Sequence, residues 1–289
     1  MNRKEPIFFL LPFVIGLLVF TVYPFINVII LSFQENYRLL SSTSSGIGLG
    51  NYEWIFSDRD FISALRNTAL YVAFTVPIST ALSIFFALML NQKLRFTSFF
   101  QTAFFLPLVT STIAVGLVWK WFYHSEYGLF NFFLSFFGVP AIHWLDDPAF
   151  ALSSMVIYGI WSILPFTILI ILAGLQNLNP QLGVAARVDG ARPALIFRRI
   201  TLPLLSPTIG LVIIINIIST SKVFMELFPL FNGRPGPGSS FYTMVYYIYE
   251  NFYLKWMLGP ASAAAVIFFL VVFTYTMLQL YIQRKWKHV

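Results

Sequence analysis

The chain contains no cysteine among its 289 residues. A disulfide framework and a thiolate metal site are therefore both excluded. Its three histidines, His124, His143 and His288, are scattered and lack the spacing of metal ligands. We therefore expect this chain to bind no metal or cofactor of its own.

Two signatures of hydrolytic enzymes are also missing. No Gly-x-x-x-x-Gly-Lys-Ser/Thr phosphate loop occurs, and the sequence has no Gly-Lys pair at all. The Gly-x-Ser-x-Gly turn that exposes a nucleophilic serine is absent as well. We therefore expect that the protein is not an enzyme, and in particular that it does not hydrolyse ATP itself.

Charged residues are scarce. They make up 10% of the chain, whereas a soluble domain has about 25%, and 58% of the residues are hydrophobic. The composition is that of an integral membrane protein surrounded by a lipid bilayer. The formal charge of +7 lies in short segments beside apolar runs, without the basic and aromatic stripe of a nucleic-acid-binding surface. We therefore expect no nucleic-acid partner.

Six apolar runs have the length that a membrane span requires, about 20 helical residues. They predict an all-α, multi-pass protein in the cell membrane, the inner or plasma membrane, with a single transmembrane domain over residues 1–289. The first run is too long for the core of a signal peptide, so we expect it to be retained. The spans are expected at residues 7–33, 64–90, 102–122, 151–172, 204–224 and 261–282.

The basic residues predict the orientation of these spans. Six spans place both termini on one side of the membrane, and 11 of the 18 Lys and Arg residues fall on that side. Cytoplasmic loops carry the excess of Lys and Arg. Both termini are therefore expected in the cytoplasm, together with the loop at residues 179–207.

This loop is too polar to span a bilayer and too regular to be a plain linker. Asn179 is a suitable N-cap, followed by Pro180 at the first helical position. Gly190 predicts the end of that helix. Pro193 predicts the start of a second short helix, which we expect to end before Pro203. The loop should therefore form an elbow of two helices tied to a membrane span on each side.

The motifs in this loop resemble the EAA loop of binding-protein-dependent ABC importer permeases. The pattern is Ala-Ala, then Asp-Gly-Ala, then Leu-Pro-Leu-Leu. The resemblance implies that the elbow docks into a cleft of a cytosolic ATPase subunit. The family usually has Glu where this chain has Val184, so the usual Glu-centred polar contact is not expected. The coupling residues implied are Val184, Ala185, Ala186, Asp189, Gly190, Ala191, Arg198, Leu202 and Pro203.

Weaker motifs in the same order extend the resemblance over nearly the whole chain. The subgroup that it resembles most is the carbohydrate importers of the maltose, oligosaccharide and glycerol-phosphate type. The resemblance implies a type I ABC importer permease fold that forms half of a sugar pathway. It also implies a second homologous permease, two cytosolic ATP-binding subunits that hold ATP and Mg, and an extracytoplasmic substrate-binding protein.

Polar and aromatic side chains in the fourth and fifth spans suggest a sugar cavity. Tyr158, Ser162 and Phe166 form a stripe along one helix, and Asn216 and Thr220 share a face of the other. Family positions on these two helices add further residues. The full candidate set is Tyr158, Trp161, Ser162, Ile163, Phe166, Asn216, Ser219, Thr220 and Val223. Alternatively, the hydroxyls bond their own helix or join two helices, and the partner permease makes the sugar contacts.

Lys222 is the ionisable residue that stands out near a span. A charge at that depth suggests function, but pairing with Glu226 and snorkelling outward is the interpretation that we favour. An ion-coupled secondary carrier would need a buried acid or histidine, which the sequence does not show. A membrane scaffold that only recruits a soluble partner remains a further alternative.

Overall fold

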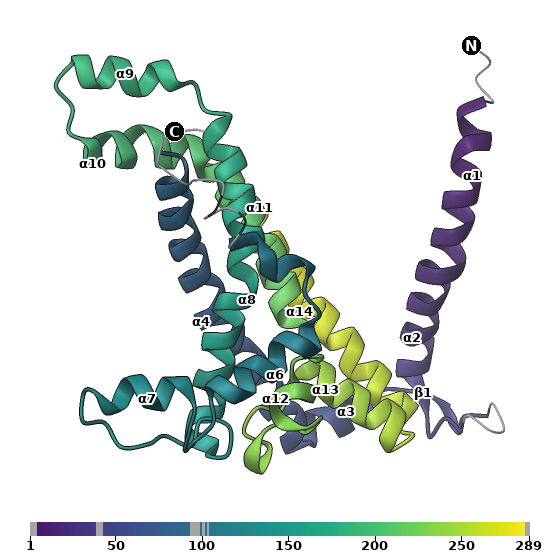
Figure 1. Ribbon diagram of the computed structural model, residues 1–289. Helices are drawn as coiled ribbons and strands as arrows, with labels where there is room; N and C mark the ends of the chain where they lie inside the picture. The colour runs from purple at the N-terminus through teal and green to yellow at the C-terminus, as the bar shows by residue number, and fades with distance from the viewer. Residues whose placement is uncertain (1–4, 39–42, 93–98, 100–101, 103, 287–289) are drawn as a thin grey trace. The chain divides into compact units, whose positions relative to one another are not determined.

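The computed structural model describes residues 5–38, 43–92, 99, 102 and 104–286. The described chain is mainly α-helical (Figure 1). Its contacts group it into two compact units. The first comprises Met1–Leu65 and Met244–Val271, and the second comprises Arg66–Thr243 and Val272–Val289. Two long helices, α4 (Arg59–Leu90) and α14 (Leu258–Trp286), contribute to both units.

The first unit begins with one long apolar helix and ends with the first part of α14. Its two short strands pair antiparallel, with Gln34 opposite Ile47. Asn51 of α3 holds the junction between α2 and β1, because its side-chain amide donates to the carbonyls of Ser32 and Gln34, each at 3.0 Å. The elements are α1 (Glu5–Leu17), a π-helical turn (Leu18–Val22), α2 (Tyr23–Phe33), β1 (Gln34–Glu35), β2 (Gly46–Ile47), α3 (Gly50–Ser57), α13 (Met244–Tyr249) and a second π-helical turn (Glu250–Leu254).

A tyrosine fixes the start of α4 within this unit. The Tyr247 hydroxyl donates to Asp58 Oδ2 at 2.7 Å, and the Tyr247 ring packs edge-on against Phe61. Burial raises the pKa of Tyr247 well above its usual value, and the carboxylate of Asp58 adds to the effect. The hydroxyl therefore remains a protonated donor throughout the neutral pH range.

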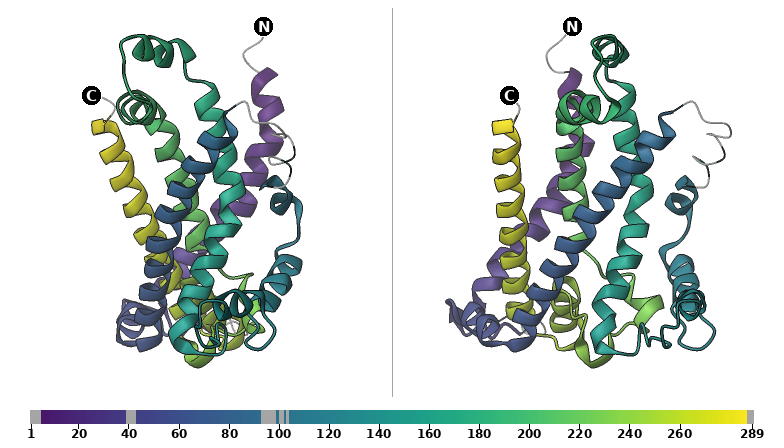
Figure 2. Two further views of the ribbon diagram at one scale, coloured as in Figure 1. Left: turned by 60° about the vertical axis from the view of Figure 1, so that its left-hand side comes forward. Right: turned by 90° about the vertical axis from the view of Figure 1, so that its left-hand side faces the viewer.

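The second unit holds the remaining helices. In both views of Figure 2 the α9–α10 elbow projects beyond the ends of α8 and α11. The elements are a 3₁₀ turn (Leu106–Val109), α6 (Thr112–Phe122), α7 (Leu129–Ser135), α8 (Pro148–Gln176), α9 (Pro180–Val188), α10 (Pro193–Ile196), a π-helical turn (Phe197–Thr201), α11 (Leu202–Ser221), α12 (Leu227–Phe231) and a 3₁₀ turn (Pro237–Ser239).

Five of the six predicted spans form helices long and apolar enough to cross a bilayer. They correspond to the first, second, fourth, fifth and sixth predicted segments. In the structure these helices cover Phe9–Phe33, Arg59–Leu90, Pro148–Gln176, Pro193–Ser221 and Leu258–Gln283.

The third predicted span, residues 102–122, is wrong as an uninterrupted helix. Leu106–Val109 form a tight 3₁₀ turn, Thr110 and Ser111 are extended, and α6 then runs for 11 residues. Pro107 donates no backbone N–H and disfavours helical geometry in the residue before it, so a break near this position follows from its chemistry. Residue 103 of this span lies outside the described residues.

The prediction that the second elbow helix ends before Pro203 is also wrong. Helix continues from Pro193 to Ser221 over 29 residues. The π-helical turn Phe197–Thr201 joins α10 to α11, and the Leu202 N–H bonds the Phe197 carbonyl. A proline ring clashes with the carbonyl four residues earlier in a regular α-helix, and the wider turn accommodates Pro203 without a break. The second helix of the elbow and the fifth span are therefore one continuous helix.

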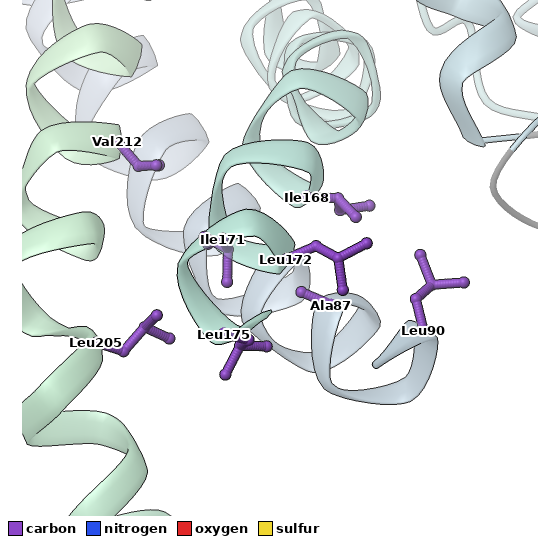
Figure 3. Packing of buried hydrophobic residues seen from close by; sticks show 8 residues of the cluster. All are labelled: Ala87, Leu90, Ile168, Ile171, Leu172, Leu175, Leu205 and Val212. Carbon is purple, nitrogen blue, oxygen red and sulfur yellow. The ribbon is translucent and has the colours of Figure 1, made fainter. Parts of the chain in front are cut away.

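Buried aliphatic side chains pack α8 against α4 and α11 (Figure 3). Close approach of α8 and α11 depends on Gly174, where an added Cβ would lie 2.8 Å from the Thr208 hydroxyl oxygen. Two glutamines of α14 also hold α11. Gln279 donates to the Gly210 carbonyl and Gln283 to the Pro207 carbonyl, each at 3.1 Å. The cluster comprises Ala87, Leu90, Ile168, Ile171, Leu172, Leu175, Leu205 and Val212.

Replacing Gly174 with valine is expected to destabilise this helix packing. The added side chain would overlap Thr208 and Leu205, and overpacking of this kind costs about 1–3 kcal/mol. We expect a lower melting temperature of the purified protein in detergent. Gly183→Val is the matched control, because nothing lies within 4 Å of a Cβ at Gly183. Equal melting temperatures for the two variants would contradict the close-packing role of Gly174.

Candidate functional site

The entry into the elbow is fixed by an N-cap. The Asn179 side-chain oxygen accepts the Gln181 N–H at 3.0 Å, and Pro180 occupies the first turn of α9. Both features match the sequence prediction. The cap satisfies one of the free N–H groups at the helix start, so α9 begins at a defined point.

The exit from α9 is a Schellman motif built on Gly190. The Ala191 N–H bonds the Ala186 carbonyl at 2.9 Å, and the Gly190 N–H bonds the Arg187 carbonyl at 3.1 Å. Gly190 has φ +81°, in the left-handed region that glycine enters readily. The prediction that Gly190 ends the helix is confirmed. Two backbone hydrogen bonds thus set the bend between α9 and α10.

The elbow presents most of its surface to its surroundings. No residue of α9 is buried. Within the predicted coupling set, the half-buried residues are Ala186, Ala191 and Leu202. The exposed residues are Val184, Ala185, Asp189, Gly190, Arg198 and Pro203. This much exposure in a segment of defined shape is typical of a docking element.

A buried polar pair joins α8 to α11. The Asn216 amide donates to the Thr167 hydroxyl at 3.0 Å, and both side chains are buried. Thr167 also lies 2.9 Å from the Ile163 carbonyl, within its own helix. Of the two interpretations of Asn216, the contact between helices is therefore the one that the structure shows. The same contact ties the elbow's two membrane helices together.

Several other candidate cavity residues also have structural roles. Tyr158 is 1% exposed and packs edge-on against the Trp119 ring at 5.5 Å. The Val223 carbonyl accepts a hydrogen bond from the Thr243 hydroxyl at 3.2 Å. Thr220 is buried, and no hydrogen-bond partner for its hydroxyl is found within the described part of the chain.

The remaining candidates keep accessible surface. Phe166 is 40% exposed and Ser219 is exposed, whereas Trp161, Ser162 and Ile163 are half-buried. Trp161 also contacts the Trp119 ring at 5.3 Å. The predicted set therefore divides into residues packed inside this chain and residues that keep accessible surface.

Residues 79–288 match the family model described as "Binding-protein-dependent transport system inner membrane component". The chain belongs to this family. It is 33% identical to the arabinooligosaccharides transport system permease protein AraP of Halalkalibacterium halodurans, over 99% of this chain and 90% of that protein. It is 31% identical to the trehalose/maltose transport system permease protein MalF of Thermococcus litoralis, over 95% of this chain and 92% of that protein.

The fold agrees with this membership. A crystal structure of a bacterial ABC transporter involved in alginate import contains a chain with a TM-score of 0.83 to this permease. The two chains are 24% identical, and the match covers 98% of this permease and 96% of the other. The predicted resemblance, the ABC importer permease fold and the location in the inner membrane are thereby confirmed. This permease belongs to a class of subunit that is not itself catalytic.

The prediction that Lys222 pairs with Glu226 is wrong. Lys222 is exposed at the end of α11, and the Glu226 carboxylate accepts the Phe224 N–H at 3.1 Å. Within the described ranges the ion pair found is Lys255 with Glu250, at 3.6 Å. The short backbone contact competes with Lys222 for the carboxylate, because a nearby N–H needs no long side chain to be ordered.

The sequence analysis did not identify Thr167 as the hydrogen-bond partner of Asn216. Its signal was present, since a Thr two residues after Pro165 in an apolar span is an uncommon polar group. Its partner on α11 is 49 positions away, so the pairing itself had no local signature.

The described residues contain no group of three or more His, Cys, Asp and Glu side chains that could hold a metal ion.

Proposed function

We propose that this permease forms half of the translocation pathway of an ATP-driven importer for an oligosaccharide. Three of its relatives are named for the transport of arabinooligosaccharides, of trehalose and maltose, and of lactose. All of these substrates are carbohydrates, which supports a carbohydrate substrate for this chain.

The proposed assembly contains several further subunits. A second homologous permease completes the pathway, and two cytosolic subunits bind ATP and Mg. An extracytoplasmic protein delivers the substrate. Two findings support this arrangement: the membership of a binding-protein-dependent transport family, and the similarity of the fold to a chain of an alginate ABC transporter that was crystallised in complex with a substrate-bound periplasmic protein.

One observation carries the coupling proposal: the elbow continues directly into a membrane helix. From Pro193 to Ser221 the helix has no break. At the other end of the elbow, α8 ends at Gln176 and α9 begins after the Asn179 cap. Asn216 and the buried aliphatic cluster hold these two helices together. A displacement of the elbow by an ATPase subunit would therefore move α8 and α11 as one body and change access to the pathway.

Reconstitution tests this function. The permease is co-purified from its native membrane, its companions are identified by mass spectrometry, and the complex is placed in proteoliposomes with the binding protein. We expect an ATP-binding subunit and a second permease, and uptake of labelled oligosaccharides that requires ATP. Uptake that requires only an ion gradient would support the secondary carrier, and no uptake with any tested sugar would favour the scaffold.

A further inference from the structure

We propose that α7 anchors the outer end of the permease by inserting a cluster of phenylalanine rings into the lipid at the membrane interface. This phenylalanine face consists of Phe132, Phe133, Phe136 and Phe137, in α7 and directly after it. Its partner is the bilayer that surrounds the spans, and not another subunit of the importer. Figure 1 shows α7 at the end of α8 opposite to the α9–α10 elbow. Because the elbow is expected in the cytoplasm, α7 belongs to the outer side.

The exposed and the buried residues of α7 lie on different sides of the helix. Residues four apart share a face, which pairs Phe132 with Phe136 and Phe133 with Phe137. The rings of the first pair pack edge-on, with their centroids 5.0 Å apart. All four side chains are more than half exposed, and Phe137 reaches 83%. Asn131, on the other side of the helix, is only 7% exposed. The rings therefore form a cluster that the rest of this unit leaves uncovered.

Asn131 fixes the direction in which this face points. Its side-chain amide donates to the carbonyls of Ser125 and Ile142, each at 2.9 Å. Its side-chain oxygen accepts the Ile142 N–H at 3.2 Å and the indole N–H of Trp144 at 3.0 Å. These four hydrogen bonds join the residues before α7 to those after it, so the helix is held in place by the protein itself. A surface oriented in advance loses less conformational entropy when it binds.

Contacts place α7 level with the second turn of the membrane helix α8. The Phe130 ring of α7 packs against the Tyr123 ring with centroids 5.1 Å apart, and the Tyr123 hydroxyl donates to the Ser154 carbonyl at 2.7 Å. The Ser154 hydroxyl lies 2.8 Å from the Trp144 carbonyl. With 29 residues α8 is about 44 Å long, whereas the hydrocarbon core of a bilayer is about 30 Å thick. The first turns of α8 therefore extend into the interface, and α7 lies there.

The chemistry of this segment favours lipid over a protein partner. No Asp, Glu, Lys or Arg occurs from Tyr127 to Ile142. Protein interfaces contain about one hydrogen bond per 100–200 Å², and the phenylalanine face offers no polar side chain for one. The hydroxyl of the exposed Ser135 lies 2.7 Å from the Phe132 carbonyl, within the helix. Fully burying one Phe side chain contributes about 1.5–3 kcal/mol, so four rings supply a substantial anchoring energy in lipid.

Spin labelling of the complete complex in phosphatidylcholine nanodiscs tests the anchor. Because this chain contains no cysteine, Phe133→Cys and Phe136→Cys each provide a single labelling site, and the wild-type complex gives the background from other subunits. Asp146→Cys is the control, at an exposed position in the loop before α8. We expect labels at 133 and 136 to meet dissolved oxygen more often than a water-soluble nickel chelate, at a depth of about 5–10 Å into the headgroup and acyl boundary. The label at 146 should show the opposite preference.

Two results with these labels would overturn the proposal. A preference for the nickel chelate at 133 and 136 would mean that water covers the face. Low accessibility to both reagents, in the complex alone or after addition of the substrate-loaded extracytoplasmic protein, would mean that a protein covers it.

The combined change of Phe133→Ser and Phe136→Ser tests whether the rings hold α7 in the lipid. A label at Phe137→Cys should move toward water in this variant, because half of the phenylalanine face is lost. The melting temperature should stay the same, because both rings are exposed in the folded chain. An unchanged depth of the label at 137 would show that the rings do not anchor α7.

Discussion

Replacing Gly190 with valine is expected to abolish ATP-driven uptake while the protein remains in the membrane. Gly190 has φ +81°, and nothing lies within 4 Å of an added Cβ, so the effect comes from the backbone alone. A left-handed conformation costs a non-glycine residue about 1–2 kcal/mol, and a β-branched residue is affected most. The Schellman bend would open, and α9 would no longer hold its angle to α10. The measurement is ATP-dependent uptake by proteoliposomes at matched protein content.

Asparagine provides the control at the same position. It tolerates the left-handed region, so Gly190→Asn should keep most of the uptake although it also adds a side chain. ATPase activity of the complex should follow the same order, because a misaligned elbow transmits binding-protein and substrate signals poorly. Full uptake by Gly190→Val at normal expression would disprove the coupling role of this bend.

The elbow could be predicted from the sequence because its signals are local. An Asn-Pro pair starts α9, and Gly190 lies where the chain must turn, and both act within a few residues. The five long spans were predictable for a similar reason, since a run of apolar residues reports directly on the requirement of the bilayer.

The errors arose where backbone geometry or distant contacts decide the outcome. Hydropathy does not register that Pro107 interrupts the third span, or that a π-helical turn carries the chain past Pro203. The interpretation of Asn216 stayed open because Thr167 lies on another helix. Lys222 was paired with Glu226 by spacing alone, and a backbone N–H proved to be the nearer partner.

Phe166→Ala is expected to raise the KM for oligosaccharide uptake about tenfold, with little change in the amount of folded protein. Sugars bind through flat apolar faces as well as hydroxyls, and the exposed Phe166 ring offers such a face on α8. Partial loss of its burial against a sugar would remove about 1.4 kcal/mol, which corresponds to a factor of ten. Initial uptake rates at increasing substrate concentration, at saturating ATP, give the KM.

Asn216→Leu supplies the contrasting variant. Asn216 is buried against Thr167, and interhelical hydrogen bonds in membranes contribute about 0.6–2 kcal/mol, so we expect a lower melting temperature and an unchanged KM. Thr167 retains its contact with the Ile163 carbonyl, which limits the loss. If Asn216→Leu raised the KM and Phe166→Ala did not, the substrate would bind at the α8–α11 interface rather than on the accessible face of α8. The two readouts thus separate residues that hold the helices together from residues that contact the sugar.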